Sequence, residues 1–160
     1  MKKSYQLFVK IRSTILVFLT HQLALPVLKI IRKPEVFPYS RVQLYEMPVG
    51  TLGKDLITML DENKFSLLTQ YARHDIKHIL LSYPTTDEGE VCLQAFMLGN
   101  GHISFPVLIT VIFGSLTMPE FWSSFINAYR RGKKSPPIDG WNWFAIVPEL
   151  THDLQKLINQ

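Results

Sequence analysis

The feature that most constrains the fold of this sequence lies in the middle of the chain, at residues 84–88. There, a signal that ends one helix is followed at once by a signal that begins the next. Pro84 discourages continuation of the preceding helix, and Thr85 with Glu88 three residues later has the pattern of a capping box that begins the next helix. Residues 66–82 are predicted to form the first helix, and Glu90 falls in the first turns of the second. Because so short a connection usually makes two helices antiparallel neighbours, Glu90 is expected to fold back towards the first helix.

Three side chains that suit a divalent cation lie on the first predicted helix. At ~3.6 residues per turn, His74, Asp75 and His78 fall within about a 100° arc of one face. Glu90 follows His78 after eleven residues, so two imidazoles and two carboxylates can converge. The interpretation is a metal site between two antiparallel helices. The alternative is a solvated helix face with ordinary i,i+3 or i,i+4 pairing and no metal.

This donor set also limits the metal. Neutral imidazoles with carboxylates suit zinc or a first-row metal such as iron or manganese, whereas calcium and magnesium prefer all-oxygen cages. Two carboxylates neutralise a dication, so the site need not bury net charge. Zinc is the metal expected first, and iron and manganese fit the same donors.

The rest of the chain is predicted to be helical as well. Further helices are expected over residues 5–31, 50–60 and 119–132, with Thr51 opening the second of these, and Gly99-Asn100-Gly101 is typical of a helix end. The apolar run 103–118 is rich in β-branched residues and would pass as a strand in isolation. No partner strand is evident, so it is predicted to be a buried helix beside the metal helix.

Length and composition complete the fold prediction. With 160 residues, 47% of them apolar, the chain is predicted to be all-α: a single compact multi-helix domain over residues 1–160. The single cysteine, Cys92, excludes an internal disulfide and is interpreted as a small buried hydrophobe.

The charge is unevenly distributed along the chain. Residues 1–34 contain seven Lys and Arg and no acidic residue, whereas the remainder contains ten basic and thirteen acidic residues. Nucleic-acid binding is therefore not expected. The basic, apolar segment 1–34 lacks a signal-peptide cleavage site, and its uncharged stretch is too short to span a membrane. It is predicted to be a helix at the domain surface or at a membrane interface. The alternatives are a helix packed on the core and a transit peptide. Arg130-Arg131-Gly132-Lys133-Lys134 is interpreted as a solvated helix end, with a second membrane-facing basic patch as the alternative.

The spaced pattern resembles the signature of a known family. His74-Asp75-x-x-His78, eleven residues and Glu90, with Pro84-Thr85-Thr86 inside, resembles the ubiquinone biosynthesis family called coenzyme Q protein four. The similarity covers about residues 44–160. Its weaker parts are Met47-Pro48-Val49-Gly50-Thr51-Leu52-Gly53, Leu93-Gln94-Ala95-Phe96, and the set Trp122, Ala128, Gly132 and Trp141. The sequence departs from the family at Ile76-Lys77, where an aromatic pair is expected, and at Ser82-Tyr83, where many members have a glycine.

The resemblance implies a function in ubiquinone biosynthesis. It implies a polyprenylated aromatic acid as substrate, with removal of the ring carboxylate and oxygenation of the same carbon. The metal would be held by His74, Asp75, His78 and Glu90, and Lys77 and Arg73 are expected to bind the substrate carboxylate.

The sequence is also compatible with other functions, and it predicts a location in the cell. The alternative function is a non-catalytic, lipid-binding organiser that holds other quinone-biosynthesis enzymes at the membrane around a structural metal. A metal-dependent hydrolase of the His-Asp doublet type is less favoured, because the further ligands of such enzymes are not evident. The expected location is cytoplasmic and peripheral to the inner face of the membrane, or on the matrix side in a mitochondrion. A homodimer through an apolar helix is also consistent with the sequence.

Overall fold

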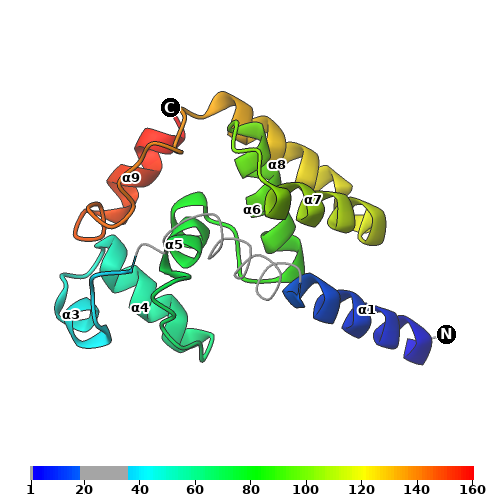
Figure 1. Cartoon of the computed structure of the whole chain (residues 1–160), viewed down its shortest axis with the longest axis horizontal. Helices are drawn as coiled ribbons and strands as arrows, with labels where there is room; N and C mark the ends of the chain where they lie inside the picture. The colour runs from blue at the N-terminus through cyan, green and yellow to red at the C-terminus, as the bar shows by residue number, and fades with distance from the viewer. Residues whose placement is uncertain (1, 19–35) are drawn as a thin grey trace. The chain divides into compact units, whose positions relative to one another are not determined.

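The computed structural model of the chain describes residues 2–18 and 36–160 (Figure 1). Over these residues the regular structure is helical, and a single bridge between Thr51 and Leu150 is the only strand-like pairing described. The all-α prediction is therefore confirmed. The chain divides into two compact units, each described by itself, so the single domain over residues 1–160 stays a prediction.

Helices from distant parts of the sequence make up each unit. The α6 unit contains α1 (Lys2–Val17), α6 (Asp87–Gly99), α7 (Phe105–Thr117), the 3-10 turn η2 (Pro119–Phe121) and α8 (Trp122–Lys134). The α4 unit contains α3 (Arg41–Glu46), α4 (Leu52–Glu62), α5 (Ala72–Leu81) and α9 (Thr151–Ile158). The predicted helix over 5–31 is described only as α1, and the rest of that range lies outside the described residues.

In the α4 unit, α4 begins where the sequence predicts. The Thr51 hydroxyl accepts a hydrogen bond from the Lys54 N–H at 3.3 Å, as an N-cap residue does. Helix α4 packs on α3 and α5, and α5 packs on α9. The C-terminal helix is fastened by polar contacts: the Thr151 hydroxyl donates to the Asp55 carboxylate at 2.5 Å, and the Gln155 amide donates to the Ile79 carbonyl at 2.9 Å. The C-terminal segment thus holds both α4 and α5.

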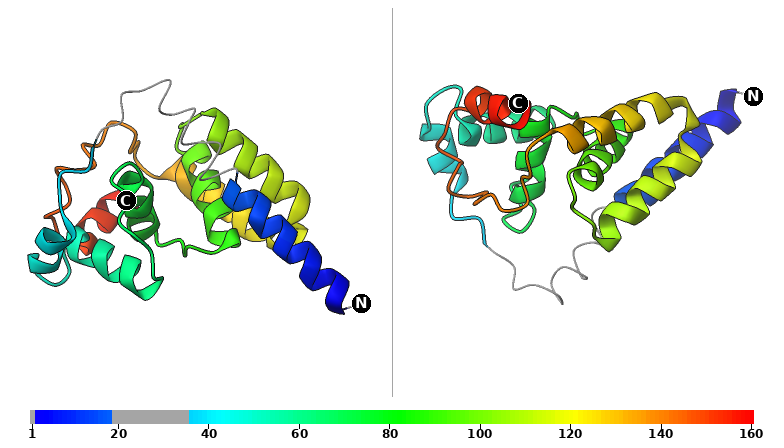
Figure 2. Two further views of the ribbon diagram at one scale, coloured as in Figure 1. Left: turned by 60° about the horizontal axis from the view of Figure 1, so that its bottom comes forward. Right: turned by 90° about the horizontal axis from the view of Figure 1, so that it is seen from above.

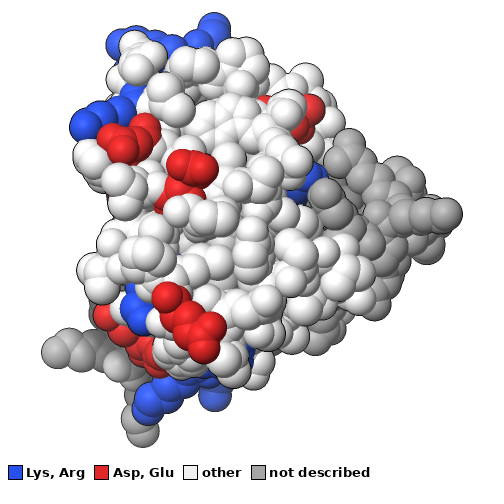
Figure 3. Space-filling model, turned by 90° about the vertical axis from the view of Figure 1, so that its left-hand side faces the viewer, with Lys and Arg blue, Asp and Glu red and all other residues white. Residues whose placement is uncertain are grey.

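Charged side chains are dispersed on the face that Figure 3 shows, which is the side of the molecule where α3, α4 and α9 lie. Acidic and basic groups occur there in small separate clusters with broad uncharged surface between them. Proteins that bind nucleic acid instead gather Lys and Arg on one surface. The described residues on this face do not form such a surface.

The end of α4 carries a strained residue that provides a test of the fold. Lys64 follows the helix with φ +58°, its N–H donates to the Asp61 carbonyl, and the Phe65 N–H donates to the Leu60 carbonyl at 2.7 Å. This is the helix-ending geometry that favours glycine, because a Cβ in the left-handed region costs about 1–2 kcal/mol.

We expect Lys64→Gly to stabilise the protein by about 0.5–1 kcal/mol, since the relieved strain exceeds the added entropy of glycine in the unfolded chain. Urea unfolding measures the difference. The Lys64→Ala variant is the control, because it removes the charge and keeps the Cβ. Equal stability of the two variants would show that the left-handed backbone at this position is not costly.

In the α6 unit, α6 packs against both α7 and α8 (Figure 2). Most of α6 is buried, and Cys92 is among its buried residues, which confirms the interpretation of that cysteine. Helices α6 and α8 approach very closely at two glycines. A Cβ on Gly99 would lie 2.1 Å from the Tyr129 carbonyl oxygen, and a Cβ on Gly132 would lie 2.1 Å from the Phe96 carbonyl oxygen. Both contacts are with backbone, so only residues without a Cβ fit at this crossing.

The apolar run 103–118 is a helix, α7, as predicted, but the expectation that it is buried is wrong. Only Val107, Thr110 and Gly114 within α7 are buried. These three residues repeat every three to four positions, so they form one stripe, and that stripe packs on the rest of the unit. Apolar side chains on the opposite side of α7 face solvent. Burial depends on what covers a helix, and in the described residues nothing covers the outer side of α7.

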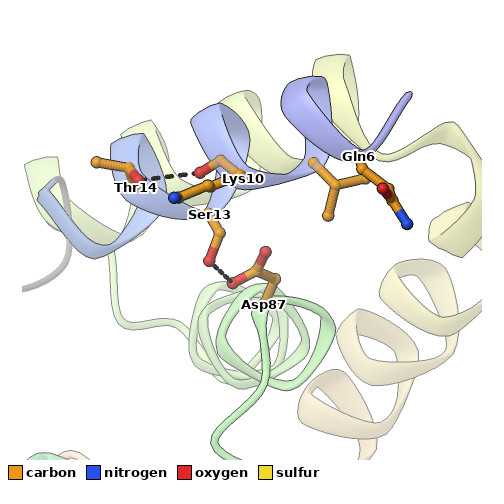
Figure 4. A pocket seen from close by; sticks show the side chains of 6 residues that line it. Gln6, Lys10, Ser13, Thr14 and Asp87 are labelled. Atoms are coloured by element: carbon orange, nitrogen blue, oxygen red, sulfur yellow. Dashed lines mark hydrogen bonds between the residues drawn. The ribbon is translucent and has the colours of Figure 1, made fainter. Parts of the chain in front are cut away.

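Helix α1 is held on the α6 unit by polar contacts. Arg12, only 6% exposed, donates from Nη1 to the Thr117 carbonyl at 3.1 Å and to the Glu120 carboxylate at 2.7 Å. The hydrogen bond from Arg12 lowers the pKa of the Glu120 carboxyl. On the same helix, the Ser13 hydroxyl donates to the Asp87 carboxylate at 3.0 Å (Figure 4). Helix α1 is thus anchored both to the α7–α8 corner and to the start of α6.

No single described helix is long and apolar enough to cross a membrane. Helix α7 and the following segment Pro119–Lys134 together meet the length and composition of a span, but they are bent by 104°.

Candidate metal centre

The two histidines of the predicted site lie on α5. This helix begins at Ala72 rather than at residue 66, because the backbone before it is used elsewhere: the Thr69 carbonyl accepts a hydrogen bond from the Phe37 N–H at 3.3 Å. In a continuing helix that carbonyl would accept from the residue four positions later. All the predicted α5 ligands still lie within the helix. The rings of His74 and His78 are 4.8 Å apart between centroids, and one ligand nitrogen of each lies within 4.8 Å of the other.

The orientation of His78 is fixed by the end of its own helix. Ser82 takes the left-handed conformation, φ 56° and ψ 38°, and ends α5. The chain then turns back, so that the Tyr83 N–H donates to the His78 carbonyl and the Tyr83 carbonyl lies 3.0 Å from His78 Nδ1. A carbonyl can only accept, so this contact places the proton on Nδ1 and makes Nε2 the nitrogen with the lone pair. A metal-binding histidine is typically oriented in this way by its second nitrogen.

His74 lies in the first turn of α5 beside an aromatic ring and a carboxylate. Its ring centroid is 5.3 Å from that of Tyr71, the residue that precedes the helix. Its Nδ1 is 3.7 Å from an Asp75 carboxylate oxygen, which is an ion-pair distance and too long for a hydrogen bond. The side chains of His74 and Asp75 are both largely buried. Asp75 therefore lies close enough to act on His74 electrostatically.

Glu90 lies in the first turn of α6, as the sequence predicts, but a different residue caps that helix. The Thr86 hydroxyl, rather than that of Thr85, accepts from the backbone at the Gly89 N–H, at 3.2 Å. The predicted capping box of Thr85 with Glu88 is therefore wrong by one position. Thr86 has the extended backbone that an N-cap needs. Acidic residues in a first turn are favoured by the positive end of the helix dipole, which suits three carboxylates at this end of α6.

The thiol of Cys92, two residues after Glu90 on α6, is buried. Burial, with a smaller contribution from the negative charge of Glu88, raises its pKa to about 11. Without a metal, a thiol in this state is protonated at neutral pH. The donors in the first turn of α6 are the carboxylates of Asp87, Glu88 and Glu90.

Comparison with known proteins bears on the fold. No protein-family model and no curated protein matches the chain. Among solved structures, the chain is similar to the crystal structure of a putative ubiquinone biosynthesis protein from Nostoc punctiforme. The two share a fold. The TM-score is 0.61 at 19% sequence identity, over 95% of this chain and 81% of the other. At that identity the likeness concerns the fold alone.

His74 and His78 offer two imidazole nitrogens and Glu90 offers a carboxylate oxygen, and donors of these kinds could hold a metal ion. The histidines belong to the α4 unit and Glu90 to the α6 unit, so the predicted site between two antiparallel helices stays a prediction. The chain between the helices is short, residues 82–86. Imidazole and carboxylate donors suit zinc, iron or manganese.

The two residues predicted to bind substrate, Lys77 and Arg73, lie on α5, partly buried. The Lys77 ammonium is 5.2 Å from the ring centroid of Trp143, which is a cation–π distance. Trp143 comes from the segment before α9 and is itself buried. The sequence did not predict this contact, because it joins residues far apart in the chain.

Proposed function

We propose that this chain is a metal-dependent protein of ubiquinone biosynthesis, with His74, Asp75, His78 and Glu90 as the metal ligands. The observation that carries the proposal is the orientation of His78, whose Nδ1 is held by the Tyr83 carbonyl so that Nε2 presents its lone pair. The neighbouring imidazole of His74 and the similarity of fold to a putative ubiquinone biosynthesis protein support it. Zinc is the first candidate metal, and iron or manganese are the alternatives.

The proposed substrate is a polyprenylated aromatic acid. The reaction replaces the ring carboxylate by a hydroxyl group on the same carbon. The carboxylate leaves as carbon dioxide, one atom of dioxygen becomes the hydroxyl oxygen, and the other leaves as water with two electrons and two protons from a separate two-electron reductant. A bound metal supplies a Lewis acid for a substrate oxygen and so stabilises negative charge on the ring. Lys77 and Arg73 provide cations on the same helix as the histidines, and their part is to bind and orient the substrate carboxylate.

Metal content tests the proposal. The purified, tag-free protein is expected to contain about one zinc or iron per chain by elemental mass spectrometry, as a site with these ligands would hold. His78→Ala and Glu90→Ala should each lose the metal. His152→Ala is the matched control, because His152 is an exposed histidine of α9, and it should keep it. Metal that survives both ligand substitutions would contradict the proposed site.

Substrate turnover distinguishes the proposed enzyme from the second candidate function. The second candidate function, a non-catalytic organiser of quinone-biosynthesis enzymes, needs the metal only for structure. The metal-loaded protein, given a polyprenylated hydroxybenzoate, dioxygen and a two-electron reductant, should release carbon dioxide and form the product with a hydroxyl group in place of the carboxylate. Asp75→Asn probes the fourth ligand: loss of metal assigns Asp75 to the metal, whereas retained metal with lost turnover assigns it to positioning His74. A metal-loaded protein without turnover on any such acid would favour the organiser.

We expect Lys77→Met to reduce turnover at least about tenfold and to leave metal content unchanged, because the variant removes the carboxylate-binding charge. The same change removes the contact with Trp143 and should cost about 0.5–1 kcal/mol of stability. Steady-state kinetics and urea unfolding measure the two effects. Lys156→Met, at an exposed lysine of α9, is the control. Reduced stability with unaltered kinetics would show that Lys77 has only a structural role.

A further inference from the structure

Two neighbouring helices of the α6 unit present apolar residues to solvent. Helices α1 and α7 pack against each other (Figure 2). On α7 the exposed residues include Leu108, Ile112 and Leu116, and Leu116 is 78% exposed. These positions repeat every four residues, so they form one stripe along the helix. An exposed stripe on one helix is the reverse of the usual arrangement, in which the apolar face of a surface helix is turned to the core.

Helix α1 has the same reversed arrangement. Its exposed residues include Leu7, Phe8, Ile11 and Ile15, which fall within about a 100° arc of the helix. The packed side of α1 contains the buried Leu16 and, four residues before it, the buried Arg12, whose contacts with Thr117 and Glu120 were described above. A charged residue thus fixes α1 on the unit while its apolar face points outward. We call the exposed apolar residues of α1 and α7 the outer stripe.

A third helix, α8, begins beside the outer stripe. Trp122, the first residue of α8, is more than half exposed, and its indole N–H donates to the Ser115 carbonyl of α7 at 2.6 Å. Ile126 and Tyr129 follow it at intervals of four and three residues and are also exposed. Trp and Tyr are the residues that favour the boundary between apolar and aqueous phases. The position of Trp122 beside the outer stripe is typical of a surface that meets such a boundary.

The charge of these helices indicates what covers the outer stripe. Helices α1, α7 and α8 contain no acidic residue, while α1 and α8 each contain four Lys or Arg. Two copies of such a surface would repel each other, so a second copy of this chain is a poor partner. A bilayer with anionic headgroups offers the complementary charge together with an apolar interior. Helices with one apolar face and basic residues elsewhere lie in the plane of such an interface.

We propose that the outer stripe is a membrane-binding surface, which enters the headgroup region of an anionic bilayer with α1 and α7 lying in its plane. The exposed Lys10 of α1 and the exposed Arg130, Lys133 and Lys134 of α8 add electrostatic attraction to the lipid headgroups. The proposal extends the sequence expectation, which gave the membrane contact to segment 1–34 and, as an alternative, to Arg130-Arg131-Gly132-Lys133-Lys134. It adds the exposed side of the run 103–118, which was predicted to be buried. It goes beyond the proposed metal chemistry and stands on different residues, so either can fail without the other.

Co-sedimentation of the full chain with lipid vesicles tests the proposal. We expect binding to vesicles of phosphatidylcholine with phosphatidylglycerol, and weaker binding to phosphatidylcholine alone. The double variant Ile112→Ser with Leu116→Ser should bind at least about tenfold more weakly, because two apolar side chains leave the interface. The matched control, Val42→Ser with Val49→Ser, changes two exposed valines of the α4 unit and should bind as the parent does.

Several outcomes would overturn the proposal. These are no binding of the parent to either vesicle, equal binding of the double variant and the parent, or equal binding to the two vesicle types. Sedimentation velocity without lipid tests the alternative occupant. A parent that is a dimer, with a monomeric double variant and no vesicle binding, would assign the outer stripe to a second copy. Circular dichroism and thermal unfolding confirm that the double variant is folded, which is expected because both positions are exposed.

Discussion

Gly132→Ala is expected to destabilise the protein by about 3 kcal/mol or more, which lowers the melting temperature by roughly 6–12 °C. A Cβ at this position would lie 2.1 Å from the Phe96 carbonyl oxygen, 2.9 Å from the Phe96 carbonyl carbon and 3.1 Å from the Asn100 nitrogen. These are backbone atoms of the last turn of α6 and of its C-cap residue, so no side chain can rotate away and the two helices must move apart. Alanine favours a helix over glycine by about 1 kcal/mol, but the clash outweighs that gain.

Two further variants make this prediction specific. Gly99→Ala places a Cβ 2.1 Å from the Tyr129 carbonyl oxygen on the other side of the same crossing, so it should show a loss of similar size. Gly140→Ala is the control, since a Cβ there meets nothing within 4 Å, and it should change stability by less than about 1 kcal/mol. Differential scanning calorimetry measures all three. Stability of Gly132→Ala equal to that of the control would mean that α6 and α8 separate at no cost.

Features set by neighbouring residues were predictable from the sequence. Thr51 caps α4 as predicted, and Gly99-Asn100-Gly101 ends α6, because both signals act within one helical turn. The cap of α6 was misplaced by one residue because two threonines stand side by side, and either can cap a helix that begins near Asp87. The choice depends on which of the two has extended backbone, and composition does not decide it.

Features set by tertiary contacts were not predictable. Helix α5 starts six residues late because the Thr69 carbonyl is engaged by Phe37. At Gly99 and Gly132, α6 and α8 approach closely although they are far apart in the sequence. A glycine by itself does not predict such a close approach. The exposure of α7 could not be predicted either, since an apolar residue is buried only if something packs on it.

At the candidate metal site, too, the sequence predicted some features and missed others. The shared helix of His74 and His78 and the place of Glu90 in the first turn of the next helix followed from periodicity and turn signals. The hydrogen bond that orients His78 did not, because it requires Ser82 in a conformation that serine rarely adopts. One sign was available: members of the resembled family often have a glycine at Ser82-Tyr83, and a glycine there would have indicated left-handed backbone at the end of α5.

Removal of metal is expected to have the second large effect. A ligand that binds only the folded state stabilises it by RT ln(1 + [L]/Kd), which is about 2.7 kcal/mol at a hundredfold excess over Kd. Treatment of the parent with a strong chelator should therefore lower its melting temperature by roughly 5–10 °C. Adding zinc or iron back should restore the melting temperature.

Glu90→Gln makes the chelator experiment diagnostic of the proposed site. The variant keeps the size of the side chain and removes the charge that neutralises a dication, so its melting temperature should be low already and should not respond to chelator. Glu62→Gln, at the C-terminal end of α4, is the control and should respond as the parent does. Equal sensitivity of Glu90→Gln and the parent would place any metal elsewhere. If chelator lowers the melting temperature only of proteins that keep His74, His78 and Glu90, the metal bound by these residues stabilises the folded protein. The reason is that binding energy that requires a folded site adds to the free energy of unfolding.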